Sequence, residues 1–206
     1  IADFDQALVS NRDYALAYYV RGNAYETRRN FDRAIQNFDQ AIKLNPNYAQ
    51  AFYDRALAYG SKGDNDRAIA DLDQVIKLDP KNALAFNNRG FAYRNKGEID
   101  RAIGDYTQAV RLDPRYALAL YNRGNAYYDR RDYDSAIANL DEAIKLNPRD
   151  PFALHDRGVA AYEKSDFERA TADYETLVKL TANIALAGAR VAASDAPRGY
   201  DRSVPE

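Results

Sequence analysis

Apolar and small residues recur along this chain with a fixed period, and a proline closes most of the periods. The prolines at positions 46, 80, 114 and 148 are each 34 residues apart. Self-similarity at this spacing predicts an array of stacked units. Counting from the prolines gives five units, at residues 15–48, 49–82, 83–116, 117–150 and 151–184, preceded by a truncated repeat at residues 1–14 of which only a second helix remains.

Each unit contains two stretches of about 13 residues whose apolar groups have helical spacing, which predicts a helical hairpin. Position 8 of the units is small, as expected where helices touch: Gly22, Ala56, Gly90, Gly124 and Gly158. Position 24 is large and apolar or aromatic: Phe38, Leu72, Tyr106, Leu140 and Tyr174. Acidic residues open the second helices and basic residues close them, which suits the helix dipole. An Asn-Pro or Asp-Pro pair then stops four of the five.

The segment NRGNAYYDRRDYDSAIANLDEAIKLNP, residues 122–148, resembles the tetratricopeptide repeat in its small residues and closing proline. The resemblance extends from residue 1 to about residue 184. It implies an all-α fold, a right-handed superhelical solenoid of antiparallel helix hairpins. The fifth unit departs from the pattern, with Ala182 in place of the proline. We expect twelve helices and no strand, including a capping helix at 185–193, and a mobile tail at 194–206.

The first helices carry the candidate binding residues. Positions 4, 8 and 11 lie on one side of an ideal helix, and positions 2, 5, 6, 9, 12 and 13 lie opposite. The resemblance implies that this opposite face lines a concave groove. Asn amides can pair with a peptide backbone, and Tyr rings add rigid contact area. We predict that an extended peptide of a partner contacts Tyr19, Asn23, Tyr53, Asn87, Asn88, Phe91, Tyr121, Asn122, Asn125 and Tyr128.

These amides are expected to be exposed, so that replacing Asn88 and Asn122 weakens binding with little effect on folding. Alternatively, Asn and Tyr form a soluble helix surface that packs against the next hairpin. Relatives that hold acidic chaperone tails have Lys at position 2, which this chain lacks. Acidic groove residues outnumber Arg94, which predicts a neutral or mildly basic ligand; these residues are Asp54, Asp129, Asp156 and Glu163.

Arginine occupies position 7 of every unit: Arg21, Arg55, Arg89, Arg123 and Arg157. A half-buried arginine requires a charged or amide partner. Position 23 supplies one at the same period: Asn37, Asp71, Asp105, Asn139 and Asp173. We therefore predict a structural ladder, with Arg89 pairing with Asp105. The alternative is an anion-binding ladder on an accessible face.

Composition excludes several functions. The 29 basic and 31 acidic side chains give a net charge of -2, without the basic excess expected of a nucleic-acid surface. Cysteine is absent, and His155 is the only histidine, which argues against metal sites and catalytic triads. No phosphate loop or nucleophile motif is present. We therefore predict no enzyme activity, no cofactor and no metal.

The leading hypothesis is a non-catalytic protein-protein interaction scaffold that binds an extended peptide. The alternative is an assembly scaffold that self-associates through its truncated ends, where uncovered apolar faces are expected. An enzyme ranks third and an RNA-binding array fourth. No segment is apolar enough for membrane insertion. The compartment stays open, with the cytoplasm slightly ahead of the periplasm, and a chain starting at Ile1 is expected to be a fragment.

Overall fold

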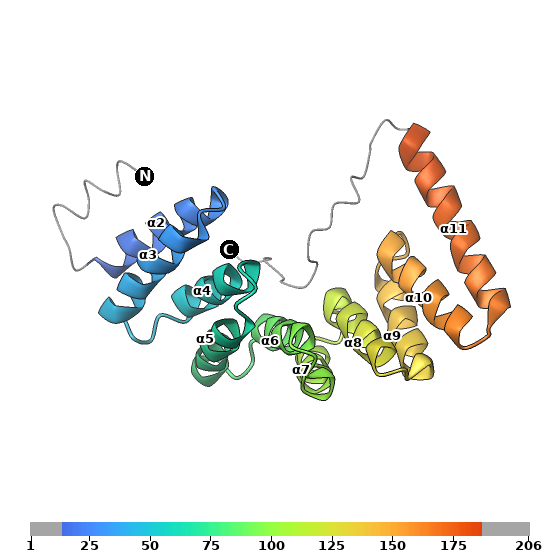
Figure 1. Ribbon diagram of the computed structural model, residues 1–206, viewed down its shortest axis with the longest axis horizontal. Coiled ribbons are helices and arrows are strands. Elements are labelled where there is room, and N and C mark those ends of the chain that lie inside the picture. The colour runs from blue at the N-terminus through green and yellow to red at the C-terminus, as the bar shows by residue number, and fades with distance from the viewer. Residues whose placement is uncertain (1–13, 187–206) are drawn as a thin grey trace. The chain divides into compact units, whose positions relative to one another are not determined.

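The computed structural model describes residues 14–186, and this part of the chain contains ten helices and no strand (Figure 1). The all-α prediction is confirmed. The two remaining predicted helices, in residues 1–14 and 185–193, fall outside the described range apart from residues 14, 185 and 186, as does the predicted tail. The helices form two compact units: unit 1 ends at Lys96 and unit 2 begins at Gly97.

Unit 1 contains two complete hairpins and one further helix. Each helix packs against the helix that follows it in the chain. The helices are α2 (Ala15–Thr27), α3 (Phe31–Leu44), α4 (Ala49–Ser61), α5 (Asn65–Leu78) and α6 (Ala83–Asn95). The helix α4 therefore has second helices on both sides, because it contacts α3 and α5.

Unit 2 begins with a second helix and continues with two hairpins. Here too each helix contacts its successor. The helices are α7 (Ile99–Leu112), α8 (Ala117–Asp129), α9 (Tyr133–Leu146), α10 (Pro151–Glu163) and α11 (Phe167–Leu186). The first helices of successive repeats, α8 and α10, also contact each other directly.

Short polar signals set the helix boundaries. The side chains of Asn30, Asp64 and Asp132 accept hydrogen bonds from the backbone three residues later and so cap second helices. The residues before the prolines, such as Asn45, take extended angles at the C-caps, as predicted. The turn inside each hairpin contains a residue in the left-handed conformation, which Gly63 and Gly97 adopt more easily than Arg29, Arg131 and Ser165 at the equivalent positions.

The core lies between the paired helices of each hairpin. Phe38, Leu72 and Leu140 are fully buried at position 24. The close approach explains the small residue at position 8: a Cβ on Gly22 would lie 2.5 Å from Cε1 of Phe38. Burying a side chain of this size stabilises the fold by about 1.5–3 kcal/mol.

The last helix runs longer than the other second helices. It continues without a break from Phe167 to Leu186, whereas α9 ends at Leu146. The physical reason is Ala182, which stands where the other repeats have proline and permits helical angles. The chain is therefore helical across the boundary at 184 that the period predicts.

Candidate functional site

The candidate site is the surface formed by positions 5, 6, 9, 12 and 13 of the first helices, here called the first-helix face. Helical periodicity assigns these positions, together with position 2, to one side of the helix, and the family resemblance implies that this side lines a groove. Within each unit, a hydrogen bond joins successive first helices between two residues that are 35 apart in the chain. This offset joins position 5 of one repeat to position 6 of the next.

In unit 1 the hydroxyl of Tyr19 on α2 donates to Oδ2 of Asp54 on α4 at 2.8 Å. The hydroxyl of Tyr53 accepts from Nδ2 of Asn88 on α6, also at 2.8 Å. Nδ2 of Asn87 donates in turn to Oδ1 of Asn88 at 3.2 Å. These bonds fix the polar groups of three consecutive first helices.

In unit 2 two side chains of α8 donate hydrogen bonds to one carboxylate of α10, that of Asp156. Oδ2 of Asp156 on α10 accepts from the Tyr121 hydroxyl at 2.6 Å and from Nδ2 of Asn125 at 3.0 Å. Nδ1 of the neighbouring His155 lies 3.0 Å from Oδ1 of the same carboxylate. The ring of His155 stands edge-on to that of Tyr174, with centroids 6.2 Å apart. Five side chains from the three helices α8, α10 and α11 therefore orient one another.

The expectation that the groove amides are exposed is wrong. Six of the ten predicted site residues are buried: Tyr53, Asn87, Asn88, Phe91, Asn122 and Asn125. The other four, Tyr19, Asn23, Tyr121 and Tyr128, are half-buried. Periodicity gives the direction of a side chain on its own helix but not how closely the next first helix approaches. The buried amides therefore contribute to folding, and four of the predicted residues remain accessible to a ligand.

Tyrosines cluster at the start of the face in unit 1. The rings of Tyr19 and Tyr48 lie 5.0 Å apart and are tilted by 42°. Burial, followed by the nearby charge of Asp54, raises the pKa of Tyr19 well above its ordinary value. Burial also raises the pKa of Tyr48. Both hydroxyls therefore stay protonated at neutral pH, and that of Tyr19 acts as a hydrogen-bond donor.

The arginines of position 7 form the predicted structural ladder. Nε donates to the position-23 residue of the same repeat in four cases: Arg21 to Asn37, Arg55 to Asp71, Arg123 to Asn139 and Arg157 to Asp173. The expected partnership of Arg89 with Asp105 crosses the boundary between the units and stays a prediction. A second partner, at position 25 of the preceding repeat, is not among the predicted contacts. Nη1 of Arg55 reaches Asp39 at 2.5 Å, and Nη1 of Arg89 reaches Asp73 at 2.6 Å.

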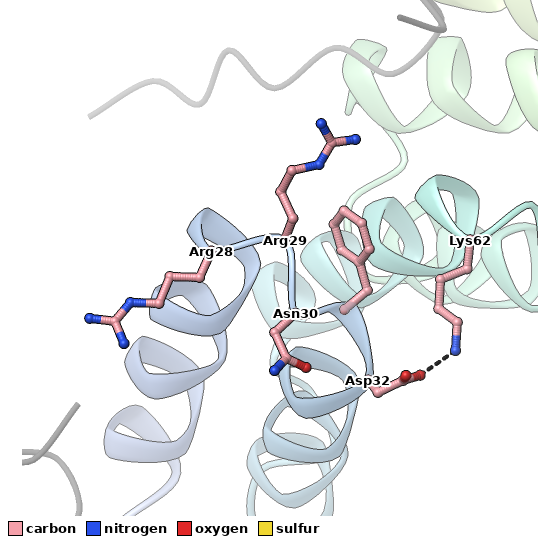
Figure 2. A pocket seen from close by; sticks show the side chains of 6 residues that line it. Arg28, Arg29, Asn30, Asp32 and Lys62 are labelled. Atoms are coloured by element: carbon pink, nitrogen blue, oxygen red, sulfur yellow. Dashed lines mark hydrogen bonds and ion pairs between the residues drawn. The ribbon is translucent and has the colours of Figure 1, made fainter.

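A second ladder of ion pairs joins position 14 of one repeat to position 18 of the previous one. It joins Lys62 to Asp32, Lys96 to Asp66, Arg130 to Asp100 and Lys164 to Asp134. An open depression of about 350 Å³ lies beside the first of these pairs. Figure 2 shows Arg28 and Arg29 extending away from the Asp32–Lys62 pair. An equivalent depression recurs beside Lys96, so this feature follows from hairpin stacking.

The described residues contain no group of three or more His, Asp or Glu side chains placed to hold a metal ion. Within the same range, no helix is both long and apolar enough to cross a membrane.

Comparison with known proteins identifies the family. The family model of the tetratricopeptide repeat matches five overlapping segments, at residues 1–49, 19–83, 53–117, 89–151 and 121–183. The chain belongs to the tetratricopeptide repeat family. A comparison with curated protein sequences finds no match. Members of this family are generally non-catalytic scaffolds for protein-protein interaction, and this assignment agrees with the predicted class of function.

Solved structures share this tetratricopeptide fold. A crystal structure of MamA is 25% identical, covers 84% of this chain and 94% of its own, and has a TM-score of 0.76. YrrB, described as a tetratricopeptide repeat protein with an unusual peptide-binding site, is 20% identical, with 89% and 95% coverage and a TM-score of 0.72. PilF of Pseudomonas aeruginosa is 19% identical, with 80% and 75% coverage and a TM-score of 0.72.

Proposed function

We propose that this protein binds an extended peptide segment of a partner protein along its first-helix face. In unit 2 the half-buried residues Tyr121 and Tyr128 make direct contacts, and in unit 1 the half-buried residues Tyr19 and Asn23 are the accessible members of the predicted set. YrrB provides a precedent for peptide binding in this fold.

The observation that carries the proposal is the fixed geometry of the face in unit 2. Tyr121 and Asn125 are held against Asp156 by hydrogen bonds of 2.6 and 3.0 Å. Binding to side chains that are already ordered avoids about 0.5–1.5 kcal/mol of entropy loss per side chain. Tyr128 adds an aromatic surface beside these groups, and its ring packs on that of Tyr133 with centroids 5.6 Å apart. A tyrosine of this kind supplies contact area at low entropic cost.

The test is a selection of peptides of about ten residues from a random display library, a length typical of extended-peptide recognition. The affinity of a selected peptide is then measured by fluorescence anisotropy for the wild type and for Tyr128→Ala. The substitution should weaken binding about tenfold, because it removes an aromatic contact. The control is Val178→Ala on α11, whose side chain is 64% exposed on a second helix and should not affect affinity. Equal losses in both variants, or in neither, would place binding elsewhere.

A second candidate function is self-association through the C-terminal end of the described array. Large apolar side chains are exposed there: Tyr162 at 59%, Phe167 at 57% and Val178 at 64%. Exposed apolar groups that gather in one region favour association. Light scattering over a range of protein concentrations checks this candidate. A mass that rises with concentration in the wild type but not in Phe167→Ser would support it, and a constant mass would exclude it.

A further inference from the structure

The carboxylate of Asp156 is both fixed in position and accessible. It accepts hydrogen bonds from Tyr121 and Asn125 at Oδ2, and Nδ1 of His155 approaches Oδ1 at 3.0 Å. Because an ionised carboxylate can only accept, His155 must be the donor in that contact. A carboxylate offers about four acceptor positions, so about one remains on Oδ1. The side chain is 28% exposed, which leaves room for a donor from a ligand.

The carboxylates of the second helices are in a different electrostatic situation. Asp173 is neutralised by Arg157, and Asp71 by Arg55, as part of the arginine ladder. Among the residues that the structure describes, neither Asp156 nor Glu163 pairs with a lysine or an arginine. Both lie on α10, at positions 6 and 13 of the same repeat, and seven residues return to nearly the same side of a helix.

The negative charges of this region also affect the pKa of Tyr128 on the neighbouring helix α8. Burial is the largest cause that raises the pKa of Tyr128. The charges of Glu163 and Asp129 raise it further, and the charge of Arg131 opposes them. An aromatic ring beside carboxylates suits a cationic side chain, because the ring face attracts the charge and the stem packs on the ring. In unit 1 the equivalent of Asp156 is Asp54, which is buried and therefore cannot serve in this way.

We propose that the segment bound on the first-helix face of unit 2 is basic, and that a lysine or arginine of the partner donates to Asp156 while a second cation faces Glu163. The inference rests on the proposed function and names the chemistry of its ligand. It sharpens the expectation of a neutral or mildly basic peptide into a requirement for cationic side chains. The partner is thus a protein with an extended, lysine- or arginine-containing segment.

The probes are peptides from the display selection, synthesised with fluorescein, and matched versions in which each lysine or arginine is replaced by glutamine. Loss of these cations should weaken binding about tenfold. Asp156→Asn should weaken the basic peptide about fivefold or more while sparing the glutamine version. Folding should survive, because the amide oxygen of asparagine still accepts from Tyr121 and Asn125, and its amide group can donate to Nδ1 of His155 once that ring takes the tautomer with its proton on Nε2. The control Glu142→Gln removes one exposed charge from the second helix α9 and should leave affinity unchanged.

A charge exchange makes the test independent of any loss of folding. Glu163→Lys should weaken the basic peptide about tenfold, and a peptide with glutamate in place of the corresponding lysine should recover that loss. If selected peptides bind through Tyr128 but show no enrichment in lysine or arginine, and Asp156→Asn and Glu163→Lys leave affinity unchanged, the basic-ligand inference is wrong and the proposed function stands. If no selected peptide depends on Tyr128, the proposed function fails and the inference with it.

Discussion

Arg55→Ala tests whether the arginine ladder holds the repeats together. Its guanidinium makes two hydrogen bonds to Asp71, from Nε at 2.8 Å and from Nη2 at 2.6 Å. Asp71 is only 5% exposed. A third bond of 2.5 Å joins Nη1 to the more exposed Asp39 on α3. Removing the guanidinium therefore leaves a buried carboxylate without its cation.

The magnitude follows from that carboxylate. Breaking a buried ion pair by removing one partner costs about 3–5 kcal/mol. We expect about 3 kcal/mol for Arg55→Ala, because water can enter where the arginine stem was. The matched control is Arg123→Ala, whose partner is the neutral Asn139. That amide keeps its bond to the Ser135 carbonyl, so the cost should be about 1 kcal/mol.

The assay is urea unfolding followed by circular dichroism, with hydrogen exchange in α4 and α5 as the local readout. Burial raises the pKa of Asp71, and Arg55 opposes that effect. Without Arg55 the folded-state pKa rises further above the unfolded value, so Asp71 destabilises at neutral pH and the penalty shrinks as the pH falls toward about 4. Asp71→Asn should recover about 1–2 kcal/mol in the Arg55→Ala background. Equal costs for Arg55→Ala and Arg123→Ala, with no recovery, would refute the reasoning.

Three further predictions concern folding. Asn88→Ala should lower the free energy of unfolding by about 1–3 kcal/mol in urea titrations, because Asn88 is fully buried and hydrogen-bonded. Gly22→Ala should cost about 1–3 kcal/mol through overpacking, whereas Gly104→Ala, with no atoms near its Cβ, should stabilise by about 0.5–1 kcal/mol; melting temperatures distinguish the two. Asp64→Ala should cost about 1 kcal/mol at pH 7. The hydrogen bond from Arg67 lowers the pKa of Asp64 below 3.8, so this difference should persist to pH 4 and shrink as acid protonates the folded state.

The sequence predicts the repeat fold because its signals are local and recur. Prolines after Asn45 and its equivalents end the second helices, and small residues such as Gly22 admit the large residue at position 24. The pairing of position 7 with position 23 can also be predicted from the sequence, because both positions belong to one hairpin and a half-buried arginine requires a partner. The length of α11 depends on a single missing proline, which indicates the continuation but not where it ends.

The candidate site is less predictable because it depends on contacts between repeats. The bond between Asn88 and Tyr53 joins residues 35 apart, on two helices whose separation no local pattern gives. Helical periodicity assigns both to the face opposite the core, which is correct in direction but does not show that they bury each other. Asp156 was recognised only as an acidic groove residue. Two of its three hydrogen bonds, those from Tyr121 and Asn125, require the placement of α8 against α10.

Photo-crosslinking tests the central claim, that the first-helix face binds a peptide. A selected peptide carrying a benzophenone side chain is irradiated with the protein, and the attachment sites are mapped by mass spectrometry. The account predicts attachment within α8 and α10, at residues around Tyr128 and Glu163, and loss of crosslinking when unlabelled peptide competes. Attachment on the second helices α9 and α11, or equal labelling by a scrambled peptide, would contradict it.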